Sequence, residues 1–367
     1  MVSSTLETRE GSSIKPAQVV EQVIPPLKDY LAELDDPRHA KGIRHPLPAI
    51  LCLCGVAMIA GAKNPEAIAD WWRVRQDLGP FLQLLGFTRD YGPSKSTLYR
   101  VLGLVSPAAF EAVLSRWTEA VLAVLPPPSG ELEAINLDGK TLRGSKKQGA
   151  PNTHLLSALS QRLGITIGQM GVEDKTNEIG AMSAFLTNLV ITGRVITTDA
   201  FHTQTAMSQT VVDLGGDYVM IVKDNQPTLR ADLETLFAEP GAAEFIDDHA
   251  LKVNKGHGRL ESRCLKTSTA LNDFIIWPGA QQVFRLDRQT VIQKTGVVRE
   301  DTVYGLTSLT PDRANSDQLL ALVRGHWNIE NRSHWVRDVT FGEDGSQVRT
   351  GHLPQIMAAL RDRKSIV

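Results

Sequence analysis

The apolar positions in the first third of the chain recur at helical spacing, in runs broken by short segments rich in glycine, proline and charge. This pattern predicts four helical stretches: IPPLKDYLAEL, HPLPAILCLCGVAMIAGA, NPEAIADWWRVRQDLGPFLQLLGF and STLYRVLGLVSPAAFEAVLSRWTEAVLAVL. We therefore expect a helical domain over residues 25–125, which ends at a linker-like LPPPSGE run. The polar residues 1–24 ahead of it are typical of a disordered tail.

Two interpretations of this helical domain remain open. A helix-turn-helix would place its second helix in the major groove of DNA. That helix would have Ser96 as its N-cap and would carry Lys95, Tyr99 and Arg100. A plain helical bundle would bury the same apolar positions. Residues 1–130 contain thirteen basic and thirteen acidic side chains, so their charge favours neither interpretation.

From residue 131 the apolar pattern alternates between strands and helices. Three strands, a helix, a strand, a helix and a strand predict an α/β fold with a mixed sheet over residues 131–236. Asp138 and Asp199 each follow an apolar strand, so neighbouring strands would bring both carboxylates to one edge of the sheet. Carboxylates that close repel each other unless a proton or cation lies between them, and oxygen ligands suit Mg²⁺ or Mn²⁺. The alternative is that each aspartate only caps a turn.

A third acidic residue lies on a late helix, DQLLALVRGHWNIENRSHWVRDV. At α-helical spacing one face of this helix carries His326, Glu330, His334 and Arg337. A zinc site made by its two histidines is excluded in a continuous helix, because they would lie roughly 12 Å apart along the axis. Glu330 pointing alone at a metal held by the two aspartates is easier to build. A solvated charged face is the alternative, although it does not need the two tryptophans beside it.

The segment between these parts is expected to form a β-rich insertion over residues 240–312. Residues 251–300 contain nine Lys or Arg and four Asp or Glu, so the insertion is locally basic. A basic, aromatic wall suits nucleic acid, and we expect phosphate contacts from Lys252, Lys255, Arg259 and Arg263. An ordinary basic hairpin on a protein surface remains the alternative.

The bulk composition adds limits on partners and compartment. The formal net charge of −2 argues against wholesale coating by nucleic acid but allows a local basic groove. Three cysteines without a CxxC pair fit a reducing cytoplasm. The apolar run from Leu47 to Ala62 is short for a membrane span, so we expect a buried helix and no membrane partner.

Several short stretches, taken in order, resemble the H-repeat-associated branch of bacterial insertion-sequence DDE transposases. They are LDGKTLRGS, TTDAFHTQ, VKDNQ, KGHGRLESR, and HWNIEN followed by HWVRDVTFGED, within a likeness from about Asp35 to Leu360. The resemblance implies a ribonuclease-H-like catalytic domain that the insertion splits into residues 131–236 and 315–367. It also implies a triad that binds Mg²⁺, with Mn²⁺ as a substitute, formed by Asp138, Asp199 and Glu330.

The same resemblance implies a reaction and partners. Two metal ions would activate a water that cuts DNA at the terminal inverted repeats of the element, and the freed 3′-OH would attack target DNA. A homodimer on DNA, in the bacterial cytoplasm and associated with the nucleoid, is implied by family analogy. Contacts to DNA are then expected from Lys140, Arg143, Lys146, Lys147, Lys252, Lys255, His257, Arg259, Arg263, Trp277, His326 and Arg337.

The chain departs from the better-known relatives at a few positions. Those relatives carry an arginine four residues before the glutamate and a lysine seven residues after it, where this chain has His326 and Arg337. Asp224 stands where a glycine is expected, and the sequence stops soon after GHLPQIMAALR. A catalytically silent DNA-binding protein, decayed or domesticated, therefore remains an alternative to an active transposase. Another ribonuclease-H-like nuclease is the second alternative.

Overall fold

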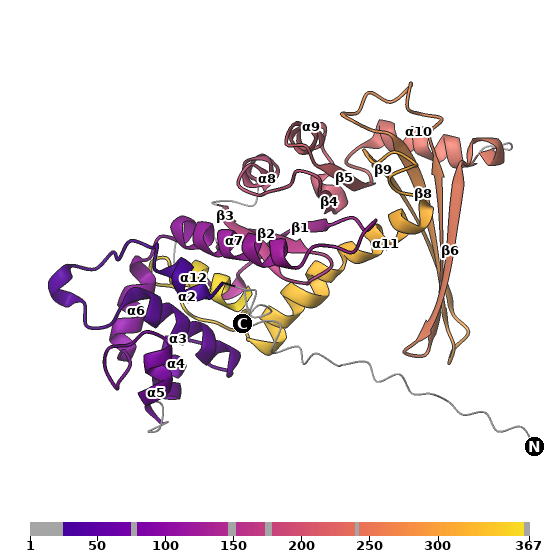
Figure 1. Ribbon diagram of the computed structural model, residues 1–367. Helices are drawn as coiled ribbons and strands as arrows, with labels where there is room; N and C mark the ends of the chain where they lie inside the picture. The colour runs from indigo at the N-terminus through magenta and orange to yellow at the C-terminus, as the bar shows by residue number, and fades with distance from the viewer. Residues whose placement is uncertain (1–24, 75–78, 146–151, 173–177, 239–241, 363–367) are drawn as a thin grey trace, which may run out of the picture.

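Three regions follow one another across the molecule: helices at one end, a sheet with flanking helices in the middle, and long β-ribbons at the other end (Figure 1). The computed structural model describes residues 25–74, 79–145, 152–172, 178–238 and 242–362. The tail at residues 1–24, which we expect to be disordered, lies outside the described residues. Two of the expected DNA contacts, Lys146 and Lys147, also lie outside them.

The helical region is built from short helices with side-chain caps at three of its turns. Its helices are α2 (Leu27–Leu31), α3 (Leu47–Ile59), α4 (Pro65–Arg73), α5 (Gly79–Leu84), α6 (Lys95–Leu104) and α7 (Pro107–Val124). The expected cap at Ser96 is wrong by two residues. Ser94 has extended backbone and accepts a hydrogen bond from the Thr97 N–H, so it caps α6, and Ser96 lies in the first turn.

The C-terminal helix α12 (Leu353–Asp362) completes the core of this helical region. Leu353, Ile356 and Met357 are fully buried and pack with residues of α3 and α6 such as Ile50 and Leu98. The family resemblance assigns residues 315–367 to the catalytic domain, and in the structure the apolar face of α12 is buried among the N-terminal helices. Helix α12 and the helices of residues 27–124 therefore share one hydrophobic core.

The central sheet has the strand order of a ribonuclease-H-like fold, which confirms the predicted fold class. Its strands are β1 (Ala134–Thr141), β2 (His154–Ser160), β3 (Thr166–Val172), β4 (Val195–Thr198) and β5 (Asp217–Val222). They lie in the order β3-β2-β1-β4-β5, with β2 antiparallel to both neighbours and β1, β4 and β5 parallel. Helices α8 (Glu178–Leu186), α9 (Thr205–Asp213) and α10 (Pro227–Ala238) connect or follow these strands.

The β-rich insertion continues this sheet. Its strands are β6 (Asp248–Gly256), β7 (Arg259–Ser268), β8 (Gln282–Ile292) and β9 (Val298–Thr307). Because β9 pairs antiparallel with β5, one nine-stranded sheet runs through both regions. Gly305 permits this junction: a Cβ there would lie 2.1 Å from the Phe284 ring and 2.5 Å from the Met220 carbonyl oxygen. Beyond the junction the strands project as long ribbons (Figure 1).

Among the described residues, no single helix is both long and apolar enough to cross a membrane, and only α6 and α7 taken together, bent by 87°, would meet that test.

Candidate active site

The three expected acidic residues line one cavity. This cavity has a volume of about 340 Å³ and lies between the ends of β1 and β4, the face of β8 and β9, and the helix α11 (Ser316–His326) with the segment that follows it. Its lining includes Asp138, Asp199 and Glu330, together with His326 and Trp327. Residues separated by almost two hundred positions in the sequence therefore meet at one solvent-accessible hollow.

The parallel pairing of β1 with β4 places the two aspartates. Leu137 pairs with Thr198 at the end of the ladder, so Asp138 and Asp199 are the next residues on adjacent strands. Asp138 Oδ1 accepts a hydrogen bond of 2.7 Å from the Gly139 N–H. Burial raises the pKa of Asp138 to about 6; the charges of Glu330 and Asp199 add to this rise, and His334 opposes it.

Asp199 caps a turn, as the alternative interpretation expects, and lines the cavity as well. Its Oδ1 accepts a hydrogen bond of 3.3 Å from the His202 N–H and caps the 3₁₀ turn η4 (Ala200–His202). The amide of Asn225 holds this turn from the next strand end by donating to the carbonyl oxygens of Ala200, at 2.7 Å, and Thr203, at 3.2 Å. This gives the VKDNQ stretch a physical role in fixing the loop that carries Asp199.

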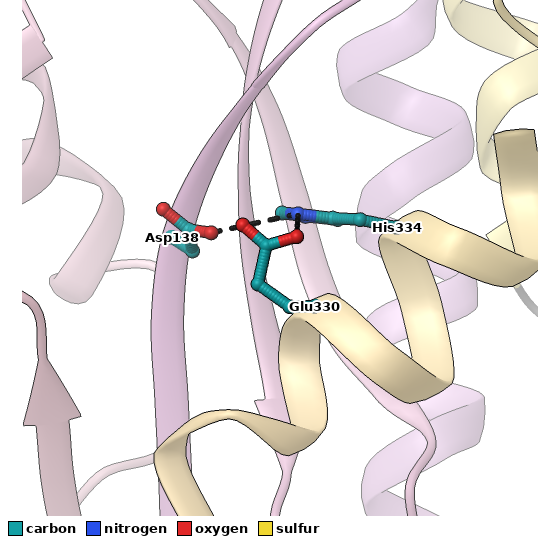
Figure 2. Close-up of side chains that lie close together, drawn as sticks. All are labelled: Asp138, Glu330 and His334. Atoms are coloured by element: carbon teal, nitrogen blue, oxygen red, sulfur yellow. Dashed lines mark ion pairs between the residues drawn. The ribbon is translucent and has the colours of Figure 1, made fainter. Parts of the chain in front are cut away.

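His334 joins the acidic residues and is a site residue that we did not predict. Ligand atoms of Asp138, Glu330 and His334 all lie within 4.8 Å of one another. The His334 Nδ1 atom is 3.5 Å from Asp138 Oδ2 and 3.6 Å from Glu330 Oε2, and Figure 2 shows the imidazole lying beside both carboxylates. The sequence places His334 on the same face as Glu330. Its partner, however, is Asp138 on β1, which no spacing along the helix could reveal.

The predicted single helix over residues 317–339 is wrong in its second half. Regular α-helix ends with α11 at His326, and π-helical turns follow as η6 (Ile329–His334) and η7 (Val336–Thr340). A π turn is wider than an α turn because its hydrogen bonds span five residues, so these side chains do not follow α-helical spacing. Asp338 faces β1, where both of its carboxylate oxygens accept from Lys140 Nζ at 2.7 Å.

The same winding turns Arg337 into the interior, so the phosphate contact assigned to it does not fit the structure. Its side chain has 0% exposure and pairs with Glu343 at 2.8 Å and Asp362 at 3.3 Å. Arg361 pairs with the other Glu343 oxygen at 3.4 Å, and Ser333 donates to Asp362 at 2.7 Å. We call Arg337, Glu343, Arg361 and Asp362 the buried ion network. It ties the Glu330 segment to α12.

Two further expected DNA contacts are occupied by protein. Lys140 is buried against Asp338. Trp277 is partly buried, packs on the core of the catalytic domain and donates from Nε1 to Ser208 at 2.8 Å. His326 lines the cavity, and its Nδ1 lies 3.0 Å from Thr197 Oγ1. Burial lowers the pKa of His326 to about 4, so it is uncharged at neutral pH and is no ionic partner for a phosphate.

The expected basic contacts of the insertion divide between the two faces of the ribbon. Arg288 and Leu286 of β8 line the cavity, and alternate residues of a strand share a face. Arg263 pairs with Arg288, and Lys252 pairs with Arg263, so this row crosses the face towards the cavity. Arg259 lies four residues before Arg263 on β7 and therefore shares its face. Lys255 lies on the opposite face, and His257, with φ of 48°, forms the hairpin tip.

The remaining expected residues, apart from Tyr99, lie at exposed places. The side chain of Arg143 is 78% exposed and lies 3.5 Å from Asp344. Lys95, Ser96 and Arg100 line a groove of about 710 Å³ in the helical region, while Tyr99 packs against its core. Six basic side chains contribute to the lining of this groove: Arg38, Lys41, Arg44, Arg73, Lys95 and Arg100. Trp327 and Trp335 are 55% and 58% exposed.

Comparison with known proteins decides the family. The model described as Transposase DDE domain matches residues 130–361, and the model described as DDE_Tnp_1-associated matches residues 28–118. The chain belongs to the DDE transposase family. Membership makes it a DNA-processing enzyme that binds DNA and uses divalent metal ions, and the cluster of Asp138, Glu330 and His334 is a group able to hold such an ion.

Individual relatives agree along most of the chain. "Putative protein YbfL" and "H repeat-associated putative transposase YhhI", both of Escherichia coli K12, are each 30% identical over 345 residues, which is 91% of this chain and 88% of each relative. A solved structure titled as a piggyBac transposase synaptic complex with hairpin DNA aligns with 96% of this chain and 72% of its own, at 11% identity and a TM-score of 0.42. The relatives place the chain among the transposases of insertion sequences.

Proposed function

We propose that this chain cuts DNA at the terminal inverted repeats of its element and joins the cut ends to target DNA. The observation that carries the proposal is the meeting of Asp138, Asp199 and Glu330 at one cavity. Carboxylates from two strand ends and one helical segment form a site for hard cations that is open on one side to a phosphodiester. The described residues that line this cavity include no serine or cysteine, and this chemistry needs none.

The side chains present fit divalent cations. Asp138 and Glu330 offer carboxylate oxygens within 4.8 Å of His334 Nδ1, and Asp199 lines the same cavity. Mg²⁺ prefers oxygen ligands, and Mn²⁺ accepts an imidazole as well, so we propose Mg²⁺ with Mn²⁺ as a substitute. Two ions held there would activate the attacking oxygen and stabilise the leaving 3′ oxygen.

The residues of the chain orient these ligands. Lys140 beside Asp338 fixes the distance between β1 and the Glu330 segment, because it joins them at 2.7 Å. Asn225 fixes the turn after Asp199. Trp327 lines the cavity and leaves more than half of its surface exposed, so its ring can stack on a base next to the scissile phosphate.

We propose that the DNA backbone runs over the cavity face of the β-ribbon. Lys252, Arg263 and Arg288 form a row that leads towards the cavity. Their present partners are Asp317, Glu261 and Asp301, and ion pairs at such surfaces are weak enough to exchange for phosphates. The basic groove of the helical region is the proposed second DNA surface, and a homodimer would bring two such ends together.

Cleavage of oligonucleotides that carry the inverted repeats tests the catalytic assignment. Asp138→Asn should lower Mg²⁺-dependent nicking on the order of a thousandfold, because it removes several kcal/mol of metal-borne stabilisation. End binding should persist. Asp224→Asn is the matched control, since Asp224 is 91% exposed and lies outside the cavity. Nicking that survives in Asp138→Asn would remove Asp138 from the site, and end binding without nicking by the unmodified chain would show a silent copy.

The salt dependence of DNA binding tests the proposed path. Changing Lys252, Arg263 and Arg288 to Gln should reduce the slope of log K against log salt by roughly 0.9 for each phosphate that the protein no longer neutralises. Changing Lys255 and Lys266 to Gln is the control, because both lie on the opposite face of the ribbon. Equal slopes for the two sets would show that the face of the ribbon does not decide which side chains bind DNA.

A further inference from the structure

A second group of titratable side chains is buried on the other side of the two aspartates. His154, Glu178 and His202 are 3%, 4% and 1% exposed. His154 Nε2 lies 3.1 Å from one Glu178 oxygen, and His202 Nε2 lies 3.1 Å from the other. We call these three residues the buried triad. It takes no part in the metal chemistry described above, although charged groups are rarely buried without a purpose in structure or function.

The buried triad packs directly against the residue that follows Asp138. A Cβ placed on Gly139 would lie 2.2 Å from Glu178 Oε1 and 2.7 Å from His154 Nε2. Successive residues of a strand point to opposite faces of the sheet. The triad therefore supports β1 from the face opposite to the Asp138 side chain. Only glycine at position 139 lets Glu178 approach the strand this closely.

The buried triad also holds the segment that carries Asp199. His202 ends the turn η4, and its backbone N–H donates to Asp199 Oδ1. Its ring is held by Glu178 at 3.1 Å. On the other side, His154 pairs with Thr141 of β1 in the strand ladder, and its Nδ1 lies 2.9 Å from Thr141 Oγ1. Glu178 thus joins the end of β1, through β2, to the turn after β4.

The ionisation state of Glu178 bears on the kind of contact that it makes with the two histidines. Burial alone would raise the pKa of Glu178, but His154 and His202 beside its two oxygens lower it to about 2. The carboxylate is therefore ionised at neutral pH and only accepts hydrogen bonds, so His202 donates to it from Nε2, while His154 Nε2 lies 3.1 Å from its other oxygen. Charge-assisted hydrogen bonds of this kind are stronger than neutral ones.

We propose that the buried triad is a positioning clamp that fixes Asp138 relative to Asp199 and thereby sets the affinity of the site for divalent cations. The inference rests on the proposed metal-dependent function. Groups that orient metal ligands without touching the metal typically change metal affinity or activity by 10–100-fold when they are removed. None of the three residues lines the cavity, so the effect of the triad must act through the strand ends.

Binding of Mn²⁺ to the full-length chain without DNA tests the clamp by calorimetry. Glu178→Ala should weaken Mn²⁺ binding by roughly 10–100-fold. Glu178→Gln keeps the shape and one acceptor oxygen, so its affinity should lie between those of Glu178→Ala and the unmodified chain. The Mg²⁺ concentration for half-maximal nicking should rise in the same order, while end binding without metal stays unchanged.

Glu133→Gln is the matched control. Glu133 is also buried, accepts hydrogen bonds from Ser160 and Arg162, and lies at the other end of β1 from Asp138. If Glu178 has only a structural role, Glu133→Gln and Glu178→Gln should lower the melting temperature by similar amounts. Neither variant should then change the affinity for Mn²⁺. If Glu178→Ala does not fold, His202→Gln carries the test, because it breaks only the arm to η4 and leaves Glu178 paired with His154.

The outcomes separate the clamp from the function on which it rests. Mn²⁺ affinity that falls in Asp138→Asn but not in Glu178→Ala or His202→Gln would overturn the clamp and leave the catalytic site intact. An unmodified chain that binds no Mn²⁺ would overturn both. A graded loss across Glu178→Gln and Glu178→Ala, with Glu133→Gln unchanged, supports the clamp.

Discussion

Two carboxylates meet at the cavity, and their pKa values shift in opposite directions. Asp138 comes from a strand end, and Glu330 comes from the π-helical segment. Burial raises the pKa of Asp138 to about 6, whereas His334 lowers the pKa of Glu330, whose side chain is 53% exposed. Neighbouring carboxylates whose environments push their pKa values apart are typical of functional sites. A negative charge on Asp138 therefore costs more free energy than a negative charge on Glu330.

The two regions also differ in what holds them. Asp138 is fixed by ladder hydrogen bonds of a central strand, which depend little on side-chain identity. Glu330 is carried by turns that the buried ion network anchors to α12, so its position depends on a few charged side chains. The backbone position of Asp138 should therefore depend less on single ion pairs than that of Glu330, although position 139 beside it admits only glycine.

The largest expected effect on stability comes from the buried ion network. Arg337→Met should lower the free energy of unfolding by roughly 3–5 kcal/mol, because Glu343 and Asp362 would lose their closest buried cation. Chemical denaturation measures this loss. Arg332→Met, at an exposed position of the same segment, is the control. Equal stabilities for the two variants would show that the segment does not depend on the network.

Neutralising Asp138 or Glu330 should change the free energy of unfolding of the metal-free protein by a smaller amount. The two changes should have opposite signs. The pKa of Asp138 is about 6 in the folded state against an ordinary value of 3.8, so the folded state keeps a proton that the unfolded state releases between these pH values. Unfolding free energy therefore falls as pH rises through this window. Asp138→Asn removes the fall and should stabilise the protein at pH 7 by up to about 3 kcal/mol.

Glu330→Gln gives the contrast. The pKa of Glu330 is lowered on folding, so its charge stabilises the folded state above the ordinary value of 4.5, and this contribution is lost as pH falls below it. Since half of the side chain is exposed, the variant should lose only a few tenths of a kcal/mol at pH 7. Thermal melts of both variants at pH 4 and pH 7 without metal measure the signs. The same sign in both would contradict the comparison.

A further effect concerns the contact that ties the two regions together. Lys140→Met breaks the contact from β1 to Asp338 and should cost about 1–3 kcal/mol of unfolding free energy. The salt slope of DNA binding should not change, because Lys140 is 8% exposed and already paired. A reduced slope would restore Lys140 as a phosphate contact. Arg143→Gln, at an exposed residue of the same stretch, tests the basic surface in parallel.

The sequence predicted the positions of Asp138 and Asp199 better than the type of helix that follows α11. Asp138 and Asp199 follow apolar strands, and parallel pairing of such strands is a local rule that brings their ends together. The predicted continuous helix at residues 317–339 assumes α-helical spacing throughout. Apolar spacing could not reveal the change to π-helical turns, nor that Arg337 then pairs with the buried carboxylates of Glu343 and Asp362.

By itself the sequence determined the order of strands and helices and the three acids, since these follow from local periodicity and from short stretches of characteristic residues. The tertiary structure alone decided that His334 joins Asp138, that Arg337 is internal and that α12 packs into the N-terminal core. It also decided that Glu178 is held by two histidines behind the strand ends. Each of these contacts joins side chains from separate elements, and their free energy depends on burial and distance, which no single stretch of sequence specifies.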